Sequence, residues 1–242
     1  MTQVIIVRPE PGATATRIAA RALGMEARAF PIFLVRPIPW VPVPREEVDA
    51  VLLGSANALR HAGAALDDLR GLPAYCVGQT TAQAAQAAGF HVVRIGVGGL
   101  QDALGALEPG HRRLLRLAGV SRVPLTLPPD VTMETREVYA STAMPMDKAL
   151  ERALQQPAVV MLHSGEAARH FNAICTGVQI DRSRIALAVI GPRVIRQAGV
   201  GWAGVRAAPQ PNDKALLALA LEMCQETAGA PKIPDERPDA GR

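Results

Sequence analysis

Four short segments of this sequence combine small and polar residues in the way that anion-binding loops do. Each follows an apolar run and opens a run of helix-forming residues: Gly54–Asn57, Gly78–Thr81, His163–Gly165 and Gly191–Pro192. Backbone N–H groups at a helix start have no partner within the helix, so they can donate hydrogen bonds to a carboxylate or phosphate. Ser55, Thr80 and Ser164 can alternatively be simple N-caps, each worth about 1 kcal/mol. Because the segments recur as two pairs, we favour the ligand-binding interpretation.

Few side chains follow a familiar catalytic motif. The sequence has no G-x-G-x-x-G after its first apolar run, no Walker-type G-x-x-x-x-G-K, no G-x-S-x-G and no H-E-x-x-H. His163 is the only one of the five histidines at a predicted strand end, and none is spaced as a metal ligand. The three cysteines, Cys76, Cys175 and Cys224, form no C-x-x-C pair, which favours reduced thiols in a cytoplasmic protein. We expect neither a metal nor a cofactor.

Strands and helices are predicted to alternate along the chain. The predicted strands are Gln3–Arg8, Glu26–Val35, Asp49–Leu53, Ala74–Val77, His91–Ile95, Arg113–Leu117, Thr132–Thr142, Ala158–Leu162, Ile185–Ile190 and Val205–Ala207. The predicted helices are Ala13–Leu23, Ser55–Leu69, Thr80–Ala88, Gln101–Leu107, Asp147–Leu154, Gly165–Ile174, Arg193–Ala198 and Asp213–Glu226. This alternation predicts an α/β fold with parallel sheets, whose ligands bind at the carboxyl ends of the strands.

An internal repeat predicts two similar domains. Asp49–Arg94 and Pro157–Arg206 are two copies of one strand-helix-strand-helix-strand unit, roughly 110 residues apart, which is too long a period for a solenoid. Five prolines between Pro31 and Pro44 cannot lie inside a sheet, so this stretch is predicted to be an extended connector. Tyr139–Pro145 would be the second crossing between the domains. We expect the domains to face each other across a cleft.

Composition and charge narrow the class of ligand. Aromatic residues make up only 3% of the chain, too few for the stacking platforms of a single-stranded nucleic-acid binder. The net charge of +4 comes mostly from scattered arginines, which suit a small polyanion better than a nucleic acid. No apolar stretch is long enough to span a membrane, and we expect no membrane partner. Residues 227–242 are rich in Pro, Asp, Gly and Arg, which predicts a disordered tail.

Five motifs, in order along the chain, resemble the uroporphyrinogen-III synthase family. They are VRPE (Val7–Glu10), LLGSANAL (Leu52–Leu59), VGQTTAQAAQAAGF (Val77–Phe90), REVYAST (Arg136–Thr142) and VIGP (Val189–Pro192). The resemblance extends to Gln225. It implies two similar flavodoxin-like α/β domains with parallel sheets, joined by a two-stranded connector and separated by a cleft. Residues 1–31 with 146–226 would form one domain, and residues 32–145 the other.

The resemblance also implies an activity and a site. Such an enzyme is a cofactor-free lyase that cyclises hydroxymethylbilane, a linear tetrapyrrole polycarboxylate, to uroporphyrinogen III in haem biosynthesis, with inversion of ring D and loss of water. Tyr139 occupies the place of the family's favoured catalytic group, a general acid on the connector. The implied substrate-binding residues are Arg8, Ser55, Ala56, Asn57, Gly78, Gln79, Thr81, His163, Ser164, Gly165, Gly191 and Arg193. The implied state is a cytoplasmic monomer, with at most a transient contact to the preceding enzyme of the pathway.

Some positions depart from the family pattern. Threonine is usual where Val7, His163 and Val194 stand, and a helix of the middle domain is missing between Val120 and Asp130. His163 can act as a cation or as a hydrogen-bond donor there, or only fill space, and Tyr139 can be merely a packed strand residue. Two alternative functions therefore stay open. One is a non-catalytic relative that keeps the fold, and the other is a hinge-type binding protein for a small polycarboxylate.

Overall fold

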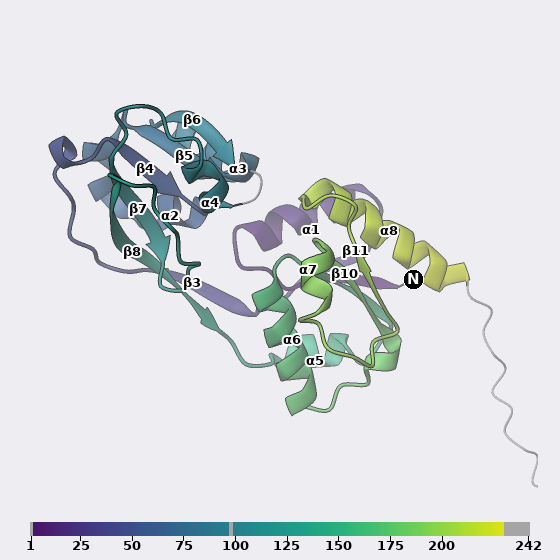
Figure 1. Ribbon diagram of the computed structural model, residues 1–242. Helices are drawn as coiled ribbons and strands as arrows, with labels where there is room; N and C mark the ends of the chain where they lie inside the picture. The colour runs from purple at the N-terminus through teal and green to yellow at the C-terminus, as the bar shows by residue number, and fades with distance from the viewer. Residues whose placement is uncertain (1, 97–98, 230–242) are drawn as a thin grey trace, which may run out of the picture. The chain divides into compact units, whose positions relative to one another are not determined.

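Two mostly parallel sheets organise the part of the chain that the computed structural model describes, residues 2–96 and 99–229. The chain divides into two compact units, unit 1 with residues 1–34 and 143–242 and unit 2 with residues 35–142. The boundaries thus fall at 34/35 and 142/143, where the sequence predicted 31/32 and 145/146. The chain passes from one unit to the other in β3 (Phe33–Pro37) and at the end of β8 (Thr132–Ala143), which are neighbouring strands (Figure 1).

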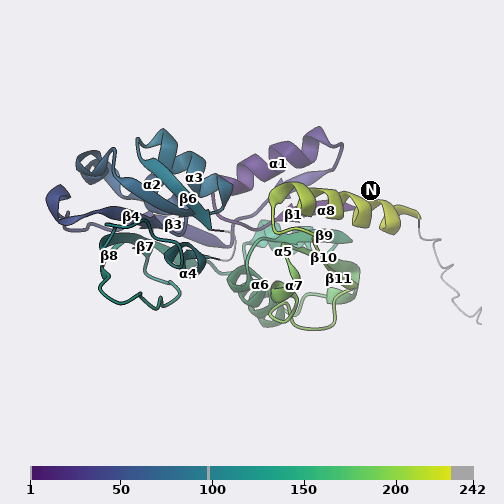
Figure 2. The same ribbon diagram turned by 45° about the horizontal axis from the view of Figure 1, so that its top comes forward.

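Unit 1 is built on a five-stranded sheet in the order β11-β10-β9-β1-β2, with every neighbouring pair parallel. Its strands are β1 (Gln3–Ile6), β2 (Ala27–Ala29), β9 (Ala158–Leu162), β10 (Ile185–Val189) and β11 (Gly204–Ala207). Helices α1 (Gly12–Ala22) and α8 (Asp213–Gly229) cover one face (Figure 2). Helices α5 (Lys148–Ala153), α6 (Gly165–Gly177) and α7 (Pro192–Ile195) cover the other face. Both faces are therefore buried, which explains the unbroken apolar runs of these strands.

Unit 2 is built on a six-stranded sheet in the order β3-β8-β7-β4-β5-β6 (Figure 1). The remaining strands are β4 (Ala50–Leu53), β5 (Pro73–Val77), β6 (His91–Gly96) and β7 (Arg113–Gly119), and β4 to β8 run parallel. Helices α2 (Ala56–His61) and α3 (Gly78–Ala87) pack on one face, and α4 (Leu100–Leu104) packs on the other. The predicted class of two parallel-sheet α/β modules is confirmed.

Local details of the predicted elements needed correction. The predicted helix Ser55–Leu69 is broken into α2 and the 3₁₀ segment Gly63–Leu69, because Gly63 has φ +70°, outside the helical region. The predicted strand Glu26–Val35 is two strands, β2 and β3. The tail was predicted to begin at Thr227, but α8 continues to Gly229, since no helix-breaking proline occurs before Pro231. Residues 230–242 lie outside the described residues.

Asp49, just before β4, is an anchor of unit 2. Its Oδ2 accepts hydrogen bonds from the backbone N–H groups of Arg112 and Arg113 at 3.0 and 2.7 Å. Its Oδ1 accepts from Nε and NH2 of Arg113 at 3.1 and 2.6 Å. The hydrogen bonds from Arg113 are the main reason that the pKa of Asp49 is lowered to about 2. The carboxylate thereby ties the start of β7 to the start of β4.

We expect Asp49→Asn to lower the melting temperature of unit 2 by a few degrees at pH 7. Because the folded-state pKa lies below the unfolded value of 3.8, the stabilisation is fully present above pH 4 and is lost as the pH falls toward 2. Thermal unfolding of wild type and variant between pH 7 and pH 3 measures the difference. Asp67→Asn is the matched control, because the carboxylate of Asp67 pairs with the exposed Arg70. Equal melting temperatures for wild type and Asp49→Asn at pH 7 would contradict the expectation.

Candidate functional site

In unit 1, two of the four predicted segments and Arg8 lie at one edge of the sheet. β1, β9 and β10 are adjacent and parallel, so the residues that follow them emerge at the same carboxyl edge. These residues are Arg8, His163–Gly165 and Gly191–Arg193. The edge also holds the starts of α6 and α7, whose first N–H groups are available to an anion.

The turns of unit 1 combine capping with close packing. The hydroxyl of Ser164 accepts a hydrogen bond from the N–H of Ala167 at 3.1 Å, so Ser164 is the N-cap of α6. A Cβ on Gly165 would come within 1.7 Å of Oε1 of Gln197, so the small residue is needed for the approach of that side chain. Gly191 is the N-cap of α7, and Arg193 is exposed on its first turn. The hydroxyl of Ser164 satisfies the N–H group of Ala167 only, so other backbone N–H groups at the start of α6 can donate to a ligand.

Arg8 and His163 form a charged cluster with Asp213, the first residue of α8. NH1 of Arg8 donates to Oδ2 of Asp213 at 2.6 Å, and Nε2 of His163 lies 3.7 Å from Oδ1 of the same carboxylate. Burial, followed by the charge of Arg8, lowers the pKa of His163 to about 4, although Asp213 and the backbone of Met161 act in the opposite direction. The imidazole is therefore uncharged at neutral pH, which favours a donor over a cation.

In unit 2, the two other predicted segments follow the neighbouring strands β4 and β5. The hydroxyl of Ser55 accepts from the N–H of Asn57 at 3.2 Å and caps α2, with Ala56 buried behind it. Asn57 also accepts a hydrogen bond from Arg60 at 3.1 Å. Because β4 and β5 are parallel, their carboxyl ends lie at the same edge of the sheet. A helix starts after each of them, α2 after β4 and α3 after β5.

The second segment of unit 2 differs from the prediction. Helix α3 begins at Gly78, which has φ +72°, and its N-cap is Val77, so Thr80 does not cap it. Gln79 is exposed at this start, whereas Thr81 is only 5% exposed and offers a ligand little surface. Glycine at this position allows the sharp turn from β5 into the helix.

Tyr139 of β8 lies beside the carboxyl end of β7. It pairs with Gly119, the last residue of β7, after a register shift between Ala118 and Gly119. A Cβ on Gly119 would come within 2.7 Å of Cε2 and Cζ of the Tyr139 ring, so the ring lies flat against this glycine. The ring centroid is 6.2 Å from that of His61 on α2. Within the described residues the hydroxyl makes no hydrogen bond, and it is not among the buried polar atoms without a partner, so it is open to solvent.

Sequence reasoning missed two members of these edges. Asp213 was visible only as an acidic residue in the first turn of a predicted helix, a common position because of the helix dipole. Gly119 carried no signal, since its role arises from the ring of a residue on another strand.

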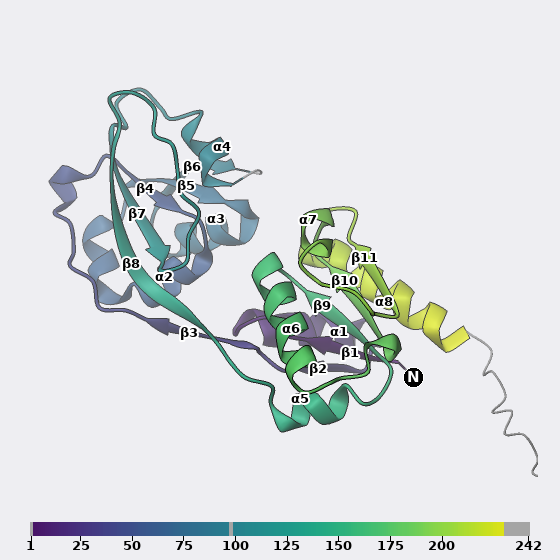
Figure 3. The ribbon, with the colours of Figure 1, turned by 60° about the horizontal axis from the view of Figure 1, so that its bottom comes forward.

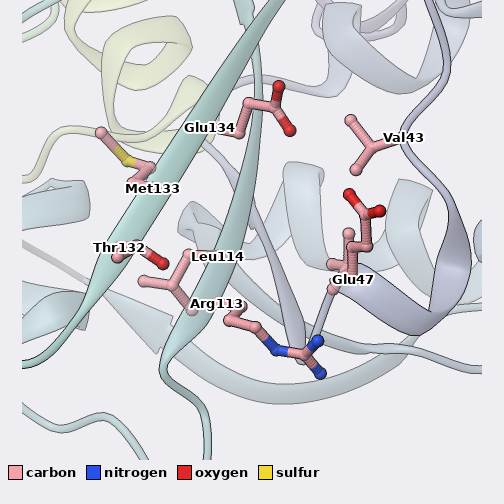
Figure 4. Close-up of a pocket in the computed structure, with 8 residues that line it drawn as sticks. Val43, Glu47, Arg113, Leu114, Thr132, Met133 and Glu134 are labelled. Carbon is pink, nitrogen blue, oxygen red and sulfur yellow. The ribbon is translucent and has the colours of Figure 1, made fainter.

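Two cavities of unit 2 lie away from these carboxyl edges. One cavity of about 360 Å³ is lined by Val43, Glu47, Val48, Arg113, Leu114, Thr132, Met133 and Glu134 (Figure 4). Arg113 and Thr132 are the first residues of β7 and β8, so this cavity lies at the amino edge of the sheet. A second cavity of about 340 Å³ lies beside Arg112 and Pro128–Val131. Neither is lined by a predicted site residue, so we do not assign them to the site.

The described ranges 2–96 and 99–229 contain no group of three or more His, Cys, Asp or Glu residues that could hold a metal ion. No helix in these ranges is long and apolar enough to cross a membrane.

Comparisons with known proteins place this geometry in a family. The family model described as uroporphyrinogen-III synthase HemD matches residues 14–218. The structure of uroporphyrinogen-III synthetase from Helicobacter pylori superposes with a TM-score of 0.60 at 16% identity, covering 92% of this chain and 100% of that one. A mutant uroporphyrinogen III synthase from Thermus thermophilus gives 0.56 at 16% identity, covering 94% and 100%. At this identity the structural likeness shows the fold alone. No curated protein sequence matches the chain.

Proposed function

The chain belongs to the uroporphyrinogen-III synthase family, and we propose that it cyclises hydroxymethylbilane to uroporphyrinogen III, with inversion of ring D and loss of water. One observation about the site carries the proposal. In each unit, helix starts with small residues gather at the carboxyl edge of a parallel sheet. Such edges suit a substrate that carries many carboxylates, because each carboxylate can accept hydrogen bonds from backbone N–H groups.

Positioning of the substrate is the main contribution that we assign to these edges. Hydroxymethylbilane closes by itself to the isomer without inversion, isomer I, so the enzyme must hold ring D where the inverted product forms. Binding of several carboxylates restricts the conformations of the linear chain before the ring closes. The backbone donors beside Ser55, Gly78, Ser164 and Gly191, with the side chains of Arg8, Asn57 and Arg193, are the proposed contacts.

Tyr139 is the proposed general acid. Its phenol would donate a proton to the terminal hydroxyl of the substrate, which leaves as water. The pyrrole nitrogen supplies the electron pair and loses its N–H proton to solvent, which forms an azafulvene. Attack on this azafulvene by the substituted carbon of ring D gives a spiro intermediate, and fragmentation followed by reclosure inverts the ring. The solvent-open hydroxyl and its place beside the carboxyl end of β7 support this role.

Gly119→Ala is expected to slow formation of isomer III about tenfold, because a methyl group at this position displaces the ring of Tyr139. The rate and the ratio of isomers III and I are measured in a coupled assay in which the preceding enzyme of the pathway makes the substrate. Gly204→Ala is the matched control, since a Cβ on this strand glycine meets no atom within 4 Å. If both variants formed isomer III at the wild-type rate, the position of the ring would not matter.

The decisive test is product analysis. Hydroxymethylbilane is made in place by the preceding enzyme of the pathway, the reaction is oxidised, and the isomers are separated by chromatography. We expect predominantly isomer III with the chain present and only isomer I without it. Isomer I alone in both reactions would instead indicate a non-catalytic relative or a polycarboxylate-binding protein, two alternatives that the comparisons do not support.

We also propose that the protein acts as a cytoplasmic monomer with at most a transient contact to the preceding pathway enzyme. Light scattering coupled to gel filtration tests the monomer. Sedimentation of the two enzymes together tests the contact. A stable dimer or a stable complex would overturn these two statements without affecting the activity.

A further inference from the structure

One of the three nitrogens of the Arg8 guanidinium holds this group in place. NH1 donates to Oδ2 of Asp213 at 2.6 Å and to Oγ1 of Thr16 at 3.3 Å. Across residues 2–96 and 99–229, Nε and NH2 have no hydrogen-bond partner, and neither is among the buried polar atoms without one. The edge formed by Nε and NH2 is therefore open, and this edge can pair with a carboxylate through two parallel hydrogen bonds.

Gly12 allows the guanidinium to occupy this place. A Cβ on residue 12 would lie 2.5 Å from Nε, 2.8 Å from Cζ and 3.0 Å from NH2 of Arg8. Any side chain would thus push the guanidinium away from the start of α1. Glycine is needed here for space, whereas Gly63 and Gly78 are needed for their positive φ.

Asp213 is available to Arg8 because another residue caps α8. Oδ1 of Asn212 accepts the hydrogen bond from the N–H of Ala215 at 2.9 Å, which is the N-cap contact. The carboxylate of Asp213 instead faces Arg8, and its Oδ1 lies 3.7 Å from Nε2 of His163. Asp213 therefore does not cap the helix, and its carboxylate contacts Arg8 and His163 instead.

His163 adds an unsatisfied buried donor to the same cluster. Its side chain is 9% exposed, and in the part of the chain that the structure describes neither ring nitrogen has a partner with regular hydrogen-bond geometry, its contact with the Met161 backbone included. Buried polar atoms normally have a partner, so an unpartnered imidazole beside an open guanidinium edge indicates a ligand. The cluster has more donors than its single carboxylate can satisfy.

We propose that Asp213 is a positioning residue, which together with Gly12 fixes Arg8 so that its Nε–NH2 edge binds one substrate carboxylate next to His163. The inference rests on the proposed function, since the ligand is the polycarboxylate substrate. Asp213 itself does not contact the substrate in this arrangement. It acts through the orientation of Arg8.

Steady-state kinetics with hydroxymethylbilane tests this arrangement through the separation of KM from kcat. Asp213→Asn is expected to raise KM about tenfold with kcat and the isomer III fraction nearly unchanged, because one charge-assisted contact to the substrate is misaligned. Arg8→Gln should raise KM at least as much. The double variant should have the KM of Arg8→Gln alone, since Asp213 has no further effect once Arg8 is absent.

Control variants separate this role from folding. Asp181→Asn removes a carboxylate that caps a 3₁₀ turn of the same unit, where Oδ1 accepts from the N–H of Ser183 at 3.1 Å, and it should leave KM unchanged. Gly12→Ala disturbs the same guanidinium from its other side and should raise KM in the same way. If Asp213→Asn does not fold, as judged by its melting curve, Gly12→Ala alone and with Arg8→Gln carries the test.

The outcomes distinguish this inference from the proposed function. A wild-type protein that yields only isomer I overturns both. A wild-type protein that makes isomer III overturns the inference alone if KM is unchanged in Asp213→Asn, or if the effects of the two substitutions on KM multiply. A lowered KM in Asp213→Asn also overturns it, because Asp213 would then compete with the substrate for Arg8.

Discussion

Tyr139→Phe should slow formation of isomer III about 100-fold while leaving the melting temperature nearly unchanged. The rate falls because the variant cannot donate a proton to the departing hydroxyl. Stability is retained because, in the described ranges, the Tyr139 hydroxyl makes no hydrogen bond and phenylalanine keeps the ring against Gly119. Since the substrate also closes by itself, the product of the slowed reaction should shift toward isomer I. The rate and isomer ratio come from the coupled assay with chromatography.

The other tyrosine of the chain is a matched control. The hydroxyl of Tyr75 lies 2.8 Å from Nδ1 of His111 and accepts a hydrogen bond from the N–H of Glu108 at 2.8 Å, inside unit 2. Tyr75→Phe should therefore lower the melting temperature and leave the rate of isomer III formation near that of the wild type. A Tyr139→Phe variant with the wild-type rate would remove the phenol from the mechanism and leave Tyr139 a packed strand residue.

His163 should make unit 1 sensitive to acid. Its folded-state pKa of about 4 lies below the unfolded value of 6.5, so well above pH 6.5 the imidazole is neutral in both states and adds no pH dependence to stability. As the pH falls from 6.5 toward 4, the unfolded state takes up a proton that the folded state does not, and unfolding is favoured by up to about 3 kcal/mol. We expect His163→Gln to remove most of this dependence, because glutamine does not titrate.

Urea unfolding at several pH values between 7.5 and 4.5 measures the effect. The chain has two tryptophans, Trp202 in unit 1 and Trp40 in unit 2, so each unit has its own fluorescence signal once the other tryptophan is replaced by phenylalanine. Only the Trp202 signal should differ between wild type and His163→Gln. The same acid loss in both proteins would show that His163 is not the titrating group.

The sequence by itself was sufficient for the fold class and for the location of the helix-start segments. Apolar runs of four to seven residues alternate with helix-forming runs, and this alternation can be buried only in parallel sheets covered on both faces (Figure 3). The serines placed before two of the helices cap them, Ser55 at α2 and Ser164 at α6. These features depend on neighbouring residues, so a local pattern is enough to predict them.

Local breaks were harder to predict from the sequence. Gly63 and Gly78 were visible as glycines, but whether each adopts a positive φ depends on the direction that the chain must take afterwards. Because of the break at Gly63, α2 is shorter than the predicted helix Ser55–Leu69. Because of the turn at Gly78, α3 starts two residues before the predicted start at Thr80.

Only the tertiary structure decided which side chains meet at the carboxyl edges. Arg8 and Asp213 are 205 positions apart and come together because β1 is inserted beside β9, with α1 and α8 on the same face of the sheet. The same arrangement buries His163 against them, and in unit 2 the pairing of β7 with β8 brings the ring of Tyr139 onto Gly119. Strand order and register are set by packing of the whole sheet, so residues remote in sequence become partners that no local pattern encodes.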